Sequence, residues 1–289
     1  MDTIIDMAIP VAVIIIMIAI GLGVTHNDFR IAFSEPKAFL MGVAAQLILV
    51  PLIVLVFLTS LQPEREIALG IMILALCPGG AMSNILTRIA GGDVALSLSM
   101  TAITNVVSVV TMPTLVVLAA NHFVGAEVNA SEIQEITVRV ALIGTAPILL
   151  GMALRFFAPV LAQHYETSVF RIALTVFLLI MGWGVAEGMG VLYEGMILLG
   201  WHLLAVTCTL FALGMGIAWL GRLTPPRRIA LTVEIAVQNS ALGIAVGAML
   251  WSEPSGFPVY VTPAAVYGFM TYITVFPLVL MMSRASKST

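Results

Sequence analysis

The stretch Leu76–Thr104, LCPGGAMSNILTRIAGGDVALSLSMTAIT, combines an apolar run with residues that interrupt a helix. Pro78 removes a backbone donor, and Gly79 and Gly80 add flexibility, so backbone groups are freed inside a run long enough to cross a bilayer. Membrane proteins tolerate such breaks where the backbone is buried in protein or lines a cavity, and transporters place ions and substrates there. This stretch is therefore the candidate site.

The composition of the chain is that of a membrane protein. Hydrophobic residues make up 61% of the 289 residues and charged residues 9%, against roughly 25% in a soluble domain. Apolar runs of about 20 residues predict nine spans. They cover residues 4–24, 37–61, 66–90, 94–121, 136–157, 169–187, 191–221, 228–250 and 257–282. The expected fold is an all-α polytopic protein embedded in a lipid bilayer.

The basic residues predict how the chain is oriented. With nine spans, the loops on one side receive all Lys and Arg residues except Arg65 and Arg139. The positive-inside rule then places the N-terminus outside and the C-terminus in the cytoplasm. Changing the span count by one would scramble this bias. The expected location is a cell membrane, and for a bacterial source the inner membrane.

A second polar group lies in the span 228–250, within LTVEIAVQNSALGIAVG. Glu234 is the only acidic residue well inside an expected span, with Gln238 one turn later and Asn239 and Ser240 beside it. A carboxylate at membrane depth costs roughly 2.5–3.5 kcal/mol on insertion scales, so it needs a partner or a proton. No Lys or Arg lies at comparable depth. A bound hard cation is the favoured partner, and a protonated structural glutamate is the alternative.

Hydroxyl and amide side chains in two other spans could serve either packing or ligand binding. Ser97 and Thr101 are spaced i, i+4 and share one helical face, which Asn105 extends by a turn. Such residues usually bond to their own backbone or assist packing, and ligand duty is the alternative. Gln46, just ahead of Pro51, is either an interhelical contact or a ligand.

The two polar elements are related by position. The spans 66–90 and 228–250 are five spans apart, so they cross the membrane in opposite directions. The first four spans can be laid against the last four as an inverted repeat, with the polar element third in each half. Transporters are built this way, with their sites where two interrupted helices meet. Because no Pro or Gly lies between Glu234 and Ser240, the second break is inferred only from this symmetry.

Three segments resemble the bile acid:sodium symporter family. They are GLGVTHNDFRIAFSEPKAFLMGVAAQLILVP (21–51), the stretch 76–104, and EIAVQNSALG (234–243). The resemblance covers most of the chain in the right order. It implies a sodium-coupled importer of an organic anion, either bile-acid-like or a smaller carboxylate, that works by alternating access. A core domain with two crossed, discontinuous helices would comprise residues 37–121 and 191–289, beside a panel domain of residues 1–36 and 122–190.

The resemblance also implies a ligand set for two sodium ions. The first ion would lie among Ser83, Asn84, Ser97, Thr101 and Glu234, and the second among Gln46, Glu234 and Gln238 with main-chain carbonyls around Ile235 and Val237. Substrate would bind near Asn239, at a crossover that includes Ala81 and Met82. The family often has a hydroxyl or glycine at these last two positions. The nine spans are similar to the family's animal members rather than its ten-span bacterial ones.

Two other functions remain as alternatives. A proton-coupled carrier or exporter of the same fold would use Glu234 as its titrating group. An intramembrane enzyme would need a metal motif, an aspartate pair or a serine with a base, and the spans contain none of these. The protein is therefore not expected to be an enzyme or to bind nucleic acid, and its oligomeric state is not predicted.

Overall fold

The structure is a computed structural model that describes residues 11, 14–15, 17–19, 21–25, 34–125, 134, 138, 142, 146–187, 189–249 and 259–287. All regular elements in this part of the chain are helices. They are α3 (Pro36–Ala44), π-helical η1 (Ala45–Leu49), α4 (Val50–Leu61), α5 (Arg65–Leu76), α6 (Ala81–Ala90), α7 (Val94–Phe123), α9 (Ala146–Phe157), α10 (Pro159–Glu187), α11 (Met189–Leu220), α12 (Pro225–Ala236), α13 (Ser240–Met249), 3₁₀-helical η3 (Val259–Val261) and α14 (Thr262–Lys287).

Among the described residues, three continuous helical runs are long and apolar enough to cross a membrane. They are Pro36–Leu61, Met196–Leu220 and Val259–Ser283. A fourth is formed by Val94–Ser108 and Val110–Phe123 if this pair, bent by 62°, is counted as one span. The expected span 4–24 is described only in part, from residue 11 on, and most of the first ten residues of the span 136–157 lie outside the described residues. The chain is thus a helical membrane protein, and the count of nine spans stays a prediction.

Two of the expected spans are each divided into two helices. The span 66–90 consists of α5 and α6 with a break at residues 77–80, and the span 228–250 consists of α12 and α13 with a break at residues 237–239. Both breaks lie inside the protein, because every residue of Ile67–Leu76 and of Ile229–Ala236 is buried. A helix that is apolar on all sides is expected in such a central position.

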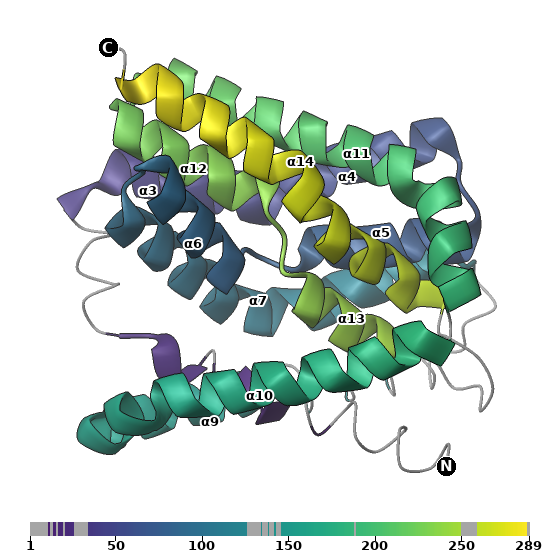
Figure 1. The fold of residues 1–289 in the computed structure, drawn as a ribbon, viewed down its shortest axis with the longest axis horizontal. Coiled ribbons are helices and arrows are strands. Elements are labelled where there is room, and N and C mark those ends of the chain that lie inside the picture. The colour runs from purple at the N-terminus through teal and green to yellow at the C-terminus, as the bar shows by residue number, and fades with distance from the viewer. Residues whose placement is uncertain are drawn as a thin grey trace.

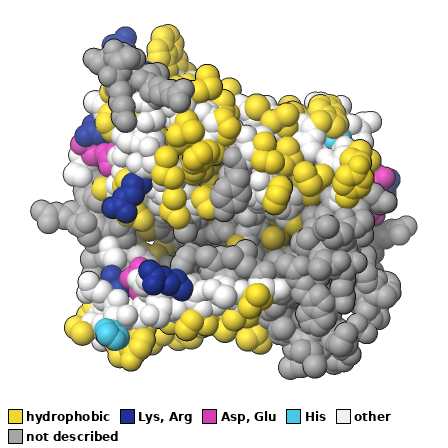
Figure 2. Space-filling view, viewed as in Figure 1, with side chains coloured by type: hydrophobic (Ala, Val, Ile, Leu, Met, Phe, Trp, Pro, Cys, Tyr) yellow, Lys and Arg dark blue, Asp and Glu magenta, His cyan; other side chains and the backbone are white. Residues whose placement is uncertain are grey.

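The remaining helices surround these broken ones. Helices α3, α4, α7, α11 and α14 enclose them in one bundle, whereas α9 and α10 run along one side of it (Figure 1). Helix α10 begins ten residues before the expected span 169–187. Pro159 suits the first turn of a helix, so the helix can begin ahead of the apolar run. Figure 2 shows hydrophobic side chains across the middle of one face and most of the Lys and Arg in view near one end.

Candidate functional site

The first break, at residues 77–80, is satisfied by side chains from two helices. Helix α5 ends because Pro78 cannot continue it, and Gly80 is the extended N-cap of α6. The freed carbonyl of Gly80 accepts hydrogen bonds from Ser83 Oγ (2.7 Å) and Asn84 Nδ2 (3.3 Å). The carbonyl of Gly79 accepts one from Asn105 Nδ2 on α7 (3.3 Å). The backbone carbonyls of Gly79 and Gly80 that the break frees are thus hydrogen-bonded inside the protein.

The second break, at residues 237–239, is made without Pro or Gly. Gln238 Nε2 donates to the carbonyl of Ile235 (2.8 Å), which caps the end of α12. Asn239 is the residue before α13, and its Oδ1 accepts from Leu242 N (3.1 Å). Asparagine is among the preferred N-cap residues, since its oxygen satisfies a backbone donor of the first turn. The pair Gln238 and Asn239 thus ends one helix and starts the next.

The two breaks lie against each other. A methyl group added to Gly79 would lie 2.8 Å from Glu234 Cδ, and one added to Gly80 would lie 3.1 Å from Asn239 Nδ2. A side chain at either glycine would push Glu234 or Asn239 out of its present position. The glycines of the first break therefore serve close approach to α12 and α13 as well as flexibility.

Glu234 is buried at the meeting point of the breaks, with its side chain facing α7. Thr101 Oγ1 lies 2.6 Å from Glu234 Oε1, and Ser97 Oγ lies 3.1 Å from Oε2. The amide oxygen of Asn84 lies 2.8 Å from Ser97 Oγ and 3.3 Å from Thr101 Oγ1. Glu234 is 1% exposed, and within the described ranges no Lys, Arg or His forms an ion pair with it.

This cluster has the chemistry of a site for a hard cation. It contains one carboxylate, one amide oxygen and two hydroxyl oxygens, which are the oxygen ligands that hard cations take from proteins. Ser97 Oγ and Thr101 Oγ1 each lie within hydrogen-bond distance of both Glu234 and Asn84, and each hydroxyl proton can serve only one of these acceptors at a time. A bound cation would interact with the oxygens that are left without a hydrogen-bond donor. A single carboxylate suits a monovalent ion.

A second group of oxygens involves Gln46. Its Nε2 donates to Gln238 Oε1 (2.8 Å), whereas its Oε1 is buried and accepts no hydrogen bond from the described residues. Gln46 lies in the π-helical turn Ala45–Leu49, and such turns are frequent at functional sites. The backbone carbonyl of Ile235, which already accepts from Gln238, lies at the same place. Val237, which precedes Gln238 in the chain, is buried and has an extended backbone conformation.

The positions expected to contact substrate are only partly described. Asn239 is 9% exposed and lies beside Gly80. Met82 packs against the apolar cluster that includes Leu86, Val233 and Val237. Ala81 begins α6, and its side chain lies outside what the structure describes. Of these three residues, Asn239 offers a polar side chain where the two breaks meet.

Sequence reasoning missed Tyr267, whose hydroxyl enters the second break from α14. It donates to the carbonyl of Ala236 (2.7 Å) and accepts from Gln238 N (3.1 Å). A tyrosine within an apolar span carried a signal, because a buried phenol needs a hydrogen-bond partner.

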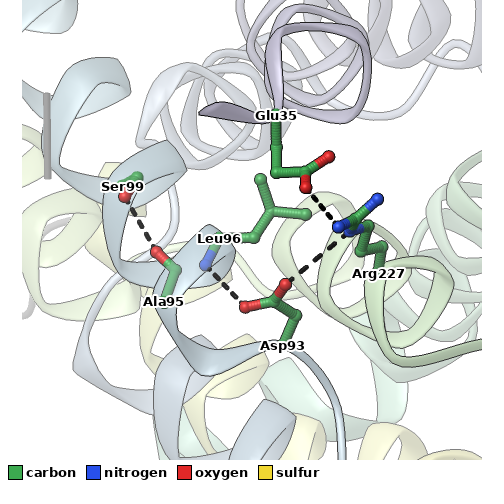
Figure 3. Close-up of polar contacts among 6 residues, drawn as sticks. All are labelled: Glu35, Asp93, Ala95, Leu96, Ser99 and Arg227. Atoms are coloured by element: carbon green, nitrogen blue, oxygen red, sulfur yellow. Dashed lines mark hydrogen bonds and ion pairs between the residues drawn. The ribbon is translucent and has the colours of Figure 1, made fainter. Parts of the chain in front are cut away.

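An ionic cluster joins the first turns of the helices that carry these residues. Arg227, in the first turn of α12, pairs with Glu35, which precedes α3, and its Nε lies 3.9 Å from Asp93 Oδ2 (Figure 3). Asp93 caps α7 by accepting from Leu96 N (3.0 Å), and its own N–H donates to the carbonyl of Pro226 (2.9 Å). The two carboxylates offset the unfavourable placement of a cation at a helix N-terminus.

We expect Arg227→Gln to lower stability by less than about 1 kcal/mol, because all three side chains are about one third exposed and are screened by salt. Thermal unfolding of the purified protein at low and high potassium chloride measures this. Lys37→Gln is the control, since it removes an exposed basic charge from neighbouring α3. The loss should shrink at high salt. An equal loss at both salt concentrations would contradict an ionic origin.

Comparison with known proteins places the chain in a family. Residues 10–194, well over half of the chain, match the model of the Sodium Bile acid symporter family. This match ends before α12, but similarity to individual proteins extends further. The chain is 27% identical over 249 residues to the uncharacterized sodium-dependent transporter YocS of Bacillus subtilis, covering 84% of this chain and 74% of that protein.

Plant and human proteins are similar to the same degree. The probable sodium/metabolite cotransporter BASS1 of Arabidopsis thaliana is 28% identical over 260 residues, with 89% of this chain covering 62% of that protein. The sodium/bile acid cotransporter 4 of Homo sapiens is 26% identical over 242 residues, with 81% of this chain covering 54% of that protein. The chain therefore belongs to the Sodium Bile acid symporter family.

Proposed function

We propose that the protein is a symporter that uses sodium to import an organic anion, either bile-acid-like or a smaller carboxylate. The observation that carries this proposal is the buried carboxylate of Glu234, which has hydroxyl partners and lies where two helix breaks meet. Family membership supports sodium as the cation, because the family consists of sodium-dependent transporters of bile acids or metabolites rather than enzymes.

Two sodium positions are proposed, sharing Glu234. The first uses Ser83, Asn84, Ser97, Thr101 and Glu234, and the second uses Gln46, Gln238, Glu234 and the carbonyls of Ile235 and Val237. The unpaired Oε1 of Gln46 supports the second position, since a buried acceptor without a donor is costly. To bind an ion there, the carbonyl of Ile235 would exchange its hydrogen bond from Gln238 Nε2 for the cation.

For transport, residues 37–121 and 191–289 would move as a core against a panel of residues 1–36 and 122–190. The position of α9 and α10 along one side of the bundle supports this division (Figure 1). Asn239 would contact the substrate from within the core. The two broken helices, third in each half of the chain, support the inverted repeat. Sodium would stabilise the arrangement of the breaks that binds substrate, so ion and solute should strengthen each other's binding equally.

The orientation is proposed from the basic residues. The starts of α3 and α12 and the ends of α6 and α14 lie at one end of the molecule in Figure 1. Most Lys and Arg side chains in view lie at the same end in Figure 2. Under the positive-inside rule this end faces the cytoplasm of a bacterial cell.

Uptake by proteoliposomes tests the proposed function. Purified protein is reconstituted and offered radiolabelled taurocholate and a panel of small carboxylates under an inward sodium gradient, with a potassium gradient of equal size as control. We expect at least one of these anions to accumulate only with sodium. Uptake that follows a pH gradient and ignores sodium would overturn sodium coupling and favour a proton-coupled carrier.

A further inference from the structure

The hydroxyl group of Tyr267 is inserted into the break between α12 and α13. Tyr267 belongs to α14 and is 1% exposed. Its oxygen donates to the carbonyl of Ala236, the last residue of α12, and accepts from the N–H of Gln238. It therefore holds the backbone on both sides of Val237 from a different helix.

This contact provides hydrogen-bond partners for backbone groups that the break leaves without helical ones. Backbone groups freed from a helix at membrane depth have no water to bond, and each unsatisfied group is costly. A phenolic hydroxyl can donate once and also accept, so one oxygen satisfies both a carbonyl and an N–H. Two further groups near the break, the carbonyl of Ile235 and the N–H of Leu242, are bonded by the break's own side chains, Gln238 and Asn239. Tyr267 is thus the contact that ties these freed groups to another helix.

The same peptide segment carries two candidate ligands of different kinds. Gln238 belongs to the second proposed sodium position and bonds to Gln46. Asn239, the next residue, is the proposed substrate contact and caps α13. A shift of the backbone at Gln238 would move the side chain of Gln238 and, through the next peptide, that of Asn239. The hydrogen bond from Gln238 N to Tyr267 holds the peptide that joins Val237 to Gln238 and so resists this shift.

We propose that Tyr267 is a positioning residue that couples the sodium position at Gln238 to the substrate contact at Asn239. The inference rests on the proposed function and goes beyond it, because Tyr267 would contact neither ion nor solute. By fixing the peptide at Gln238, its hydroxyl keeps the carbonyls and amides of the break in the arrangement that binds sodium. Without the hydroxyl, the break keeps its sequence but loses this orientation.

Tyr267→Phe tests the proposal, since it removes one oxygen and keeps the ring. The melting temperature of the purified protein is followed while potassium chloride is replaced by sodium chloride at constant ionic strength. We expect the sodium concentration at half-maximal stabilisation to rise about tenfold, which corresponds to about 1.4 kcal/mol. Thr274→Val is the matched control, because it removes a hydroxyl of α14 that, among the described residues, bonds to Met270 O of its own helix and to no group of either break.

The outcomes separate positioning from a merely structural role. A lower melting temperature in potassium with an unchanged sodium midpoint would overturn the proposal and make Tyr267 a packing residue. If the wild type itself shows no response to sodium, the proposed function has failed instead. Failure of the proposed function would appear in the wild type, whereas failure of this inference would appear only in Tyr267→Phe, so the two are distinguishable.

Hydrogen exchange in the wild type gives a second test that needs no variant. If Tyr267 fastens the break to α14, sodium should slow amide exchange both in residues 236–242 and in residues 264–270. Potassium at equal concentration is the control. Slower exchange confined to residues 236–242 would overturn the proposal, because the break would then respond to sodium without engaging α14.

Discussion

Replacing Glu234 with alanine is expected to abolish stabilisation of the purified protein by sodium and to abolish sodium-driven uptake. The carboxylate is the one formal negative charge of the proposed sodium positions, so the remaining amide and hydroxyl oxygens cannot offset the loss of the ion's hydration water. Sodium at about one hundred times its Kd would stabilise the wild type by about 2.7 kcal/mol. We expect none of this in the variant.

The measurement is thermal unfolding in sodium chloride and in potassium chloride at equal ionic strength. In potassium the variant no longer buries a carboxylate without a cation, but it loses the hydrogen bonds from Ser97 and Thr101 and leaves a cavity, so each protein is compared with itself in the two salts. Glu64→Ala is the control, since it removes an exposed carboxylate that makes no capping hydrogen bond at the start of α5. An undiminished sodium response in Glu234→Ala would contradict the assignment.

Adding one methyl group at Gly79 is expected to have an effect nearly as large. In Gly79→Ala the new carbon would overlap Glu234 Oε1 and lie 3.1 Å from Ser83 Oγ. The glutamate side chain can turn away, so the fold should survive, but its oxygens would leave Ser97 and Thr101. We expect at least a tenfold weaker response to sodium, with the melting temperature in potassium changed little.

Gly216→Ala is the matched control for this substitution. Gly216 lies in α11, and a methyl group added there meets no atom within 4 Å. Alanine should be neutral or slightly stabilising at this helical position. Sodium titration of melting temperature compares the two variants. If Gly79→Ala binds sodium as the wild type does, the close approach of the first break to Glu234 has no part in ion binding.

The sequence predicted those features that depend on local chemistry. The first break is readable from Pro78 followed by two glycines, because this combination disfavours a continuous helix. A proline alone does not predict a break here, since Pro113 and Pro277 lie inside helices. The shared face of Ser97 and Thr101 follows from their spacing, and the structure turns that face toward Glu234. Their roles as ligands stay predictions.

The other features depend on residues far apart in the chain, and the second break was inferred from the symmetry of the two halves rather than read from its own residues. The break at residues 237–239 contains no helix breaker, and it is held by Tyr267, which lies 29 residues from Gln238. The capping preference of Asn239 was a local signal for this break. Helix α10 begins at Pro159 rather than at 169, because a polar segment can be helical without being apolar enough to predict a span.

Binding of radioactive sodium to the purified protein, with no solute present, tests the central claim most directly. The account predicts saturable binding that approaches two ions per chain, that unlabelled sodium displaces and potassium does not, and that disappears in Glu234→Ala. An absence of saturable binding to the folded wild type would contradict a sodium site at the meeting point of the two breaks. The same binding in Glu234→Ala as in the wild type would contradict the role of this carboxylate.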